Sequence, residues 1–489
     1  MTDSDDSTTY RARALSGGRW GAMRGVVIQL VGLLTTAALT RILSDVDYGL
    51  VAIAVVVLAL FDLITAVGFG ASIVRTGDLQ EGLVASYFWG SILLGGAAGG
   101  LAGLLSTPAA SLAGAVEAAP LIAVGALTLP LSLATAVPVG LLSRRLKFRS
   151  LAFIDIASML THAAVAIPLA ALGFGPWAVV VGYVVRAGAR LGMAMFAAKF
   201  FPRPRLRLLE LKKDLGFNLS FFATDAVAYA NKNADYWFVG NVLGAALLGS
   251  YYVAYVIPTL LRRRVTGVAH DVLYPIISKF QDDTERIISA YLKVTRLVAF
   301  ILLPALLGLS VTADLAVRIG FGQGWDDSIT PLALISIAAA VAALGVPAVP
   351  IFPAVGRPLQ LVTIGGVSLL ILLLTLLATT GFTSLVVVAW CVIAAAVTEL
   401  VVLQTRLKTI LGMSPSRWLG AIAPFGVSAI VMAVVVVGAR AWVFAGLPMA
   451  IEALAAVTVG LGVYLAMGRL GYRIHFRDQL EAARALIKR

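Results

Sequence analysis

Three consecutive arginines, Arg262 to Arg264, interrupt one of the long apolar stretches of this sequence. A charge near the centre of a bilayer costs about 3 kcal/mol on insertion scales, so these side chains are expected to meet water or an anion. The guanidinium fork matches phosphate oxygens, which makes a phosphate group the expected ligand. Successive helical residues point about 100° apart, so Arg262 and Arg263 are the best candidates. Alternatively, the helix is shorter and the arginines extend to a membrane interface.

A second polar group lies in the apolar stretch 215–240. Asn231, Lys232 and Asp235 fall close together there, and Asp225 precedes Lys232 by about two helical turns. Residues three and seven apart share one helix face, so we interpret these side chains as a wall that binds sugars or ions. The alternative is a structural ion pair between Lys232 and Asp235, which neutralises itself.

Two arginines flank the first apolar stretch, residues 20–42. Arg24 would guide an anionic head group into a cavity from the inside, and Arg41 would meet it at the outer face. The alternative interpretation assigns Arg24 to membrane topology and Arg41 to an interfacial anchor.

Acidic residues inside apolar runs are candidates for coupling to H⁺ or Na⁺. The sequence offers Asp62, Asp155, Asp225 and Glu399 without a way to rank them. Three histidines in separate segments make no metal-ligand set, and we find no Gly-Lys-Ser/Thr phosphate loop. We therefore expect no cofactor, no metal and no enzymatic activity.

The elements that must position these residues are membrane-spanning helices. Of 489 residues, 60% are hydrophobic and 13% charged, against roughly 25% charged in soluble domains. Spans of about 20 residues with short loops predict an all-α integral membrane protein of about fourteen helices, which excludes a soluble enzyme, a secreted disulfide scaffold and a β-barrel. The expected spans are 20–42, 50–73, 82–105, 117–142, 150–172, 175–199, 215–240, 248–277, 291–312, 329–352, 359–379, 383–405, 417–438 and 447–467.

The net charge of +13 follows from the distribution of basic residues among the loops. If the N-terminus is inside, the outer loops contain only Arg41, Arg318 and Arg440, whereas most Lys and Arg residues lie in the inner segments. The positive-inside rule therefore predicts an even number of spans and cytoplasmic termini, and the charge requires no nucleic acid. Residues 1–19 lack the apolar core of a cleaved signal peptide.

Weak internal repeats predict two related lobes. Leu43 to Gly49 resembles Leu243 to Gly249 at an offset of 200 residues, and the segment after Pro138 resembles that after Pro350. Repeated halves are common in transporters. The expected organisation is a tail at 1–19, an N-lobe at 20–200, a linker at 201–214, a C-lobe at 215–411, two extra helices at 412–468 and an amphipathic tail at 469–489.

Several motifs carry a resemblance to a known family. They are Thr40 to Ala52, Gly68 to Arg75, Asn231 to Asp235, Gly240, Leu243-Gly244, Leu248 to Tyr251, Ala254-Tyr255, Pro258, Tyr274-Pro275, Gly324-Trp325 and Gly356-Arg357. Over about residues 15–410 the chain resembles the Wzx-like polysaccharide transporters, or oligosaccharide flippases, of the multidrug/oligosaccharidyl-lipid/polysaccharide superfamily. Ala254 to Arg263 is also similar to a span of the related lipid II flippases, in which arginines line a cavity.

The resemblance implies a flippase in the bacterial cytoplasmic membrane. It would move undecaprenyl-diphosphate-linked oligosaccharide from the inner to the outer leaflet by alternating access, for surface polysaccharide export. Expected partners are this lipid, membrane lipids and a polysaccharide polymerase or export machinery, and the expected unit is a monomer. The alternatives are an ion-coupled multidrug antiporter of the same superfamily and a membrane-embedded glycosyltransferase or polymerase.

Overall fold

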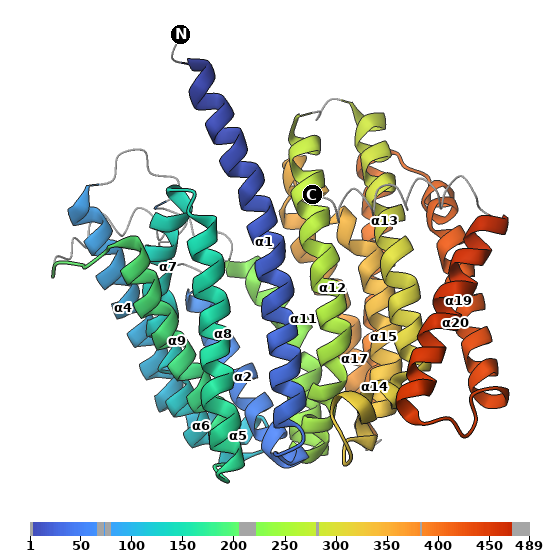
Figure 1. Ribbon diagram of the computed structural model, residues 1–489, viewed down its shortest axis with the longest axis horizontal. Helices are drawn as coiled ribbons and strands as arrows, with labels where there is room; N and C mark the ends of the chain where they lie inside the picture. Colours follow the sequence, from blue (N-terminus) through green and yellow to red (C-terminus); the bar gives the residue numbers. More distant parts are fainter. Residues whose placement is uncertain are drawn as a thin grey trace. The chain divides into compact units, whose positions relative to one another are not determined.

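The computed structural model describes residues 3–65, 73, 80–204, 222–279, 283–381 and 384–471. Every regular element in these ranges is a helix (Figure 1). The chain divides into two compact units: Met1–Tyr229 with Gly244–Gly249, and Ala230–Leu243 with Ser250–Arg489. The expected linker lies largely outside the described residues, as do most of the C-terminal tail and the side chains of the N-terminal tail.

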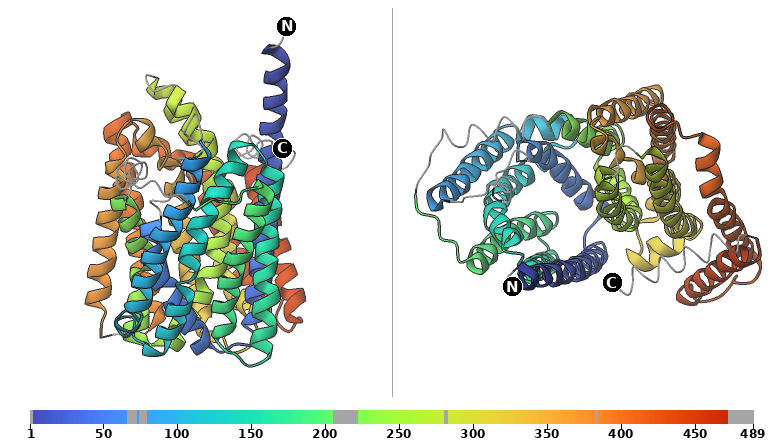
Figure 2. Two further views of the ribbon diagram at one scale, coloured as in Figure 1. Left: turned by 90° about the vertical axis from the view of Figure 1, so that its left-hand side faces the viewer. Right: turned by 90° about the horizontal axis from the view of Figure 1, so that it is seen from above.

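Long helices aligned side by side build the N-terminal unit (Figure 2). Between its last two long helices the chain reverses at Gly173 and Gly175, whose φ angles of 86° and 55° favour glycine. The helices are α1 (Asp3–Leu39), α2 (Asp45–Thr65), α4 (Glu81–Leu104), α5 (Ser106–Leu112), η1 (Val116–Ala118), α6 (Ala119–Gly125), α7 (Thr128–Arg144), α8 (Phe148–Ala171) and α9 (Trp177–Ala198).

The second unit is also built of long helices, and the unit boundary falls within α11 and near the start of α12. The side chains of Ser384 and Ser414 cap the first turns of α18 and α19. The helices are α11 (Phe222–Phe238), a π turn η2 (Val239–Leu243), α12 (Ala245–Lys279), α13 (Thr284–Val311), α14 (Ala313–Gly320), η3 (Asp326–Ser328), α15 (Ile329–Gly345), η4 (Val346–Ala348), α16 (Ile351–Ala354), α17 (Leu359–Ala378), α18 (Leu385–Leu411), α19 (Pro415–Trp442) and α20 (Met449–Gly471).

Within the described residues, 12 helices are long and apolar enough to cross a membrane. The prediction of a multi-pass, all-helical membrane protein is therefore confirmed at this level. The two expected spans that miss the criterion are the first and the seventh. In α1 only Met23–Leu39 forms a shorter apolar segment, and α11 carries Asp225, Lys232 and Asp235 in 17 residues. These two helices hold much of the polar chemistry singled out from the sequence.

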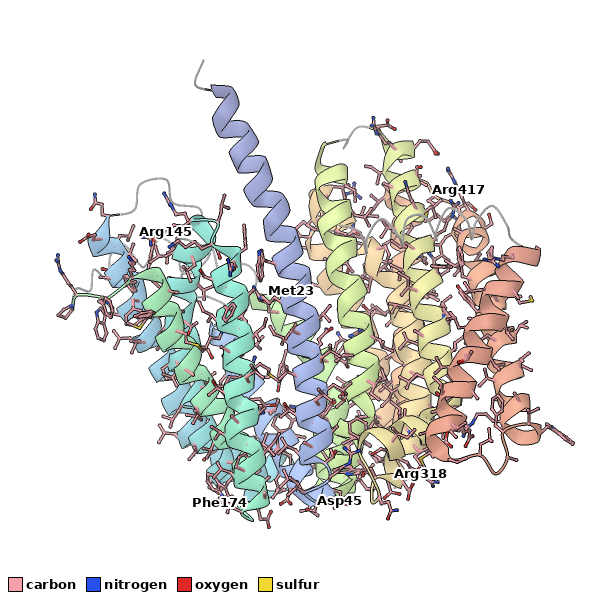
Figure 3. All side chains as sticks on the ribbon, viewed as in Figure 1. Met23, Asp45, Arg145, Phe174, Arg318 and Arg417 are labelled. Carbon is pink, nitrogen blue, oxygen red and sulfur yellow. The ribbon has the colours of Figure 1, made fainter. Side chains whose placement is uncertain are left out.

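Apolar side chains on the outside of the helices fit a lipid environment. Large residues such as Leu34, Leu104, Phe196 and Leu454 are exposed. Soluble proteins rarely expose so many large apolar residues together, whereas lipid tails accept them. In the N-terminal unit, Arg145 lies at one end of the helices and Phe174 at the opposite end (Figure 3).

The two segments of the internal repeat meet at their glycines. A side chain on Gly49 would collide with the backbone of Ala245, and one on Gly249 with the backbone of Asp45. The contact is reciprocal because the offset of 200 residues relates Asp45 to Ala245 and Gly49 to Gly249. The starts of α2 and α12 therefore approach so closely that only glycine fits at either position.

Candidate functional site

A charged cluster joins three helices of the N-terminal unit through Asp155. One carboxylate oxygen lies 2.8 Å from Nε of Arg24 on α1, and the other lies 2.8 Å from Nε of Arg190 on α9. The Asp155 side chain is 10% exposed, while those of Arg24 and Arg190 are 40% and 35% exposed. The carboxylate is thus held inside the unit, and the two guanidinium groups reach its surface.

Packing of α8 between α1 and α9 brings these side chains together (Figure 1). On one side, the Arg149 guanidinium lies over the Trp20 ring of α1, 5.4 Å from its centroid. On the other side, His162 stacks on Tyr183 of α9 with 4.5 Å between ring centroids. The first contact, before Asp155 in the sequence, holds α8 against α1. The second, after Asp155, holds α8 against α9.

The cluster lies inside the apolar parts of its helices. Asp155 stands about two turns after the start of α8, and Arg190 about two turns before the end of α9, or roughly 11 Å along each helix. These two helix ends adjoin, because Arg145 donates a hydrogen bond to the carbonyl of Ala198 at 3.0 Å. Arg186, one turn before Arg190, is half-buried and interacts electrostatically with Asp155. Two arginines thus pair with one acid, and a third acts on it electrostatically.

A second buried carboxylate, Asp235, lies in the second unit and has different partners. It accepts hydrogen bonds from the hydroxyls of Tyr251 at 2.8 Å and Tyr255 at 2.6 Å, and from the backbone N–H of Tyr236 at 3.0 Å. Asp235 is 2% exposed and Tyr251 is fully buried. The π turn η2 begins one turn later, and such turns often mark functional sites.

The structure separates the expected polar wall on α11 into different environments. Lys232 is exposed, while Asp235 is buried and accepts hydrogen bonds from two tyrosine hydroxyls and a backbone N–H. Asn231 donates to the carbonyl of Gly365 on α17 at 2.7 Å. Asn231 therefore joins two helices, and a role of these residues in binding sugar stays a prediction.

The other expected residues are dispersed. Arg41 is exposed in the turn after α1 and donates to the carbonyl of Ala37 at 3.0 Å. Arg262 is half-buried at the end of the apolar part of α12, where its charge acts on Glu399. The side chains of Arg263 and Arg264 lie outside the described residues. Asp62 is exposed and Asp225 half-buried.

Sequence reasoning missed Arg190, Tyr251 and Tyr255 as partners of the buried acids. The available signal was spacing: Arg186 and Arg190 are four apart in an apolar run, as are Tyr251 and Tyr255, so each pair shares a helix face. Sequence spacing does not show which acid faces which pair. Among the described residues, no group of three His, Cys, Asp or Glu side chains lies close enough to hold a metal ion.

These helices and the charges within them define a multi-pass membrane protein. A profile of the family described as polysaccharide biosynthesis protein matches residues 38–330, so the chain belongs to this family. This finding confirms the resemblance drawn from the sequence.

Curated relatives agree with this assignment. The chain is 27% identical over 348 residues to the lipopolysaccharide biosynthesis protein WzxC of Escherichia coli (strain K12), covering 69% of each protein. It is 27% identical over 304 residues to the succinoglycan biosynthesis transport protein ExoT of Rhizobium meliloti (strain 1021), covering 62% of each.

The fold has a counterpart among solved structures. The lipid II flippase MurJ, in an inward closed conformation, aligns with a TM-score of 0.76 at 13% identity, covering 92% of this chain and 98% of that one. The two proteins therefore share a fold across almost their whole length.

Proposed function

We propose that this protein is a flippase for lipid-linked oligosaccharide. It moves undecaprenyl-diphosphate-linked oligosaccharide from the inner to the outer leaflet of the bacterial cytoplasmic membrane by alternating access, and so serves surface polysaccharide export. Membership of the polysaccharide biosynthesis family, a relative named as a transport protein and the fold of a lipid II flippase support this proposal.

The observation that carries the proposal is the excess of arginine in the N-terminal unit. Arg24 and Arg190 pair with Asp155, and Arg186 interacts with it electrostatically, within the apolar parts of their helices. An excess of positive charge in a membrane is stable only where water or an anion meets it. A diphosphate head group supplies that anion, whereas the cationic substrate of a multidrug antiporter would be repelled.

Several finer features belong to the proposal. The termini are cytoplasmic, and α1 and α11 cross the membrane with the 12 apolar helices to give fourteen spans. Arg41 and Arg262 to Arg264 also contact the diphosphate. The protein acts as a monomer, alongside a polysaccharide polymerase or export machinery.

Sidedness of a labelled lipid-linked oligosaccharide in proteoliposomes tests the proposal. The protein should raise the rate at which the glycan becomes accessible on the opposite side, without changing any covalent bond. A new glycosidic linkage in the product would indicate a transferase. Uptake of a cationic dye without lipid flipping would indicate the antiporter.

A further inference from the structure

Both oxygens of Asp155 are engaged by Nε atoms, one from each arginine. We propose that Asp155 is a positioning residue, which holds Arg24 and Arg190 by Nε so that their Nη groups bind the diphosphate of the substrate. The inference rests on the proposed function and names Arg190 as a diphosphate ligand and Asp155 as the residue that orients both forks.

The chemistry follows from the shape of the guanidinium group. It carries five N–H donors in one plane, of which Nε has one and the two Nη atoms have four. Asp155 contacts both Arg24 and Arg190 at Nε, at 2.8 Å in each pair. The edge formed by Nη1 and Nη2 is separate from this Nε contact, and such an edge can bind two phosphate oxygens in parallel.

One arginine of the second unit shows what a purely structural arrangement looks like. Arg440 donates from Nε to Glu452 at 2.9 Å, and from Nη1 and Nη2 to the two oxygens of Asp314 at 2.9 and 2.6 Å. Two acids thus occupy the whole fork of one arginine. Around Asp155 the ratio of acids to arginines is reversed. One acid pairs with two arginines, and Arg186 lies one helical turn before Arg190.

The arrangement favours a ligand with two adjacent anionic groups. The single carboxylate fixes two guanidinium groups next to each other, and each exposed fork matches one phosphate. A monophosphate can engage one fork fully, whereas a diphosphate engages both. The chemical class is therefore a diphosphate ester, with the remainder of the lipid outside the cluster.

Binding of farnesyl diphosphate to the purified full-length chain tests this inference, with farnesyl monophosphate as the comparison. Arg190→Lys keeps the charge but removes the fork, and we expect a loss of diphosphate affinity of about tenfold or more with little change for the monophosphate. Asp155→Asn makes the cluster more positive, yet it should also lower diphosphate affinity, because an amide has a single oxygen to orient two guanidinium groups. Arg440→Lys is the matched control and should bind as the wild type does.

Two results would overturn the inference. One is unchanged diphosphate affinity in Arg190→Lys, and the other is tighter binding in Asp155→Asn, which would make Asp155 a competitor of the ligand. If Asp155→Asn fails to fold, Arg190→Lys decides alone, and size-exclusion profiles identify that case. Flipping by the wild type is measured separately. If the wild type flips the lipid but Arg190→Lys binds the diphosphate normally, the site is rejected and the flippase is kept. If Arg190→Lys loses diphosphate affinity but the wild type flips no lipid, the flippase is rejected and the site is kept.

Discussion

Among the described residues, each unit buries one aspartate among its helices, but the two carboxylates have opposite surroundings. Asp155 joins two arginines whose side chains are more than a third exposed, whereas Asp235 meets tyrosine hydroxyls inside its unit. Buried polar groups need partners, and these partners can be charged or neutral. A partly exposed ionic cluster can exchange one of its partners for a ligand. A buried carboxylate with uncharged partners instead holds its helices in place. We therefore expect Asp155 to govern ligand binding and Asp235 to govern stability.

The flipping rate should separate the two regions most strongly. Replacing Arg24→Ala together with Arg190→Ala removes both forks, and we expect the initial flipping rate to fall by about 100-fold or more, since each charge-assisted pair is worth about a factor of ten. Asp235→Asn keeps an acceptor oxygen and should stay within about threefold of the wild type. Proteoliposome rates at equal reconstitution levels measure both variants. Equal losses would remove the functional distinction between the two sites.

Stability should differ between the two conservative amide substitutions. Asp155→Asn leaves two guanidinium groups without a counter-charge, and we expect it to lower the free energy of unfolding by about 2 kcal/mol, a value reduced by the partial exposure of the arginines. Asp235→Asn removes no ion pair and should cost about 1 kcal/mol. Unfolding of both variants in one detergent provides the comparison. A larger loss for Asp235→Asn would show that Asp235 depends on its negative charge.

The two tyrosines give a finer test of the Asp235 site. Tyr251→Phe and Tyr255→Phe each remove one donor to the same carboxylate oxygen, and each should cost about 1 kcal/mol. The double variant should cost more than the two single costs together, because the oxygen then loses its last hydroxyl partner. Unfolding free energies of the wild type and the three variants give the coupling. A strictly additive result would mean that Asp235 does not need the hydroxyls.

The smallest effect concerns Asp314, a third carboxylate that lies between two spans. Burial alone would raise the pKa of this carboxyl, but hydrogen bonds and charge from Arg440 outweigh it and hold the pKa below 3.8. Ionised Asp314 therefore stabilises the fold above pH 3.8, and this contribution is lost as the pH falls through the lowered pKa. The melting temperature of the wild type should exceed that of Asp314→Asn by a constant amount from pH 7 to pH 5, and the difference should shrink below pH 4. A difference that does not vary with pH would place the effect in packing.

Much of the fold was predictable because lipid imposes a simple rule on sequence. Backbone groups in hydrocarbon must bond internally, so long apolar runs have to be helices, and most predicted runs correspond to helices in the structure. The prediction was less complete for α1 and α11. The described part of α11 has 17 residues and carries Asp225, Lys232 and Asp235, and in α1 only Met23–Leu39 forms an apolar segment.

The candidate site was less predictable. The sequence pointed to Arg24 and Asp155 as separate candidates with different roles, and the structure places them in one ion pair. It allowed a pair between Lys232 and Asp235 on one helix. In the structure, Asp235 accepts hydrogen bonds from two tyrosines of the next helix, α12. Spacing along a chain restricts which residues share a face. It does not restrict which face of another helix lies opposite.

The sequence by itself determined the membrane setting, the helical class and the family, because hydropathy, loop charge and local motifs are properties of contiguous residues. Helix packing decided which charges meet. The repeat at Gly49 and Gly249 illustrates both parts. The likeness of the two segments is readable along the chain, whereas their backbone contact exists only because α2 and α12 approach at those glycines. Asp155 likewise becomes a positioning residue only where α1, α8 and α9 pack together, because an ion pair between distant segments depends on three-dimensional distance.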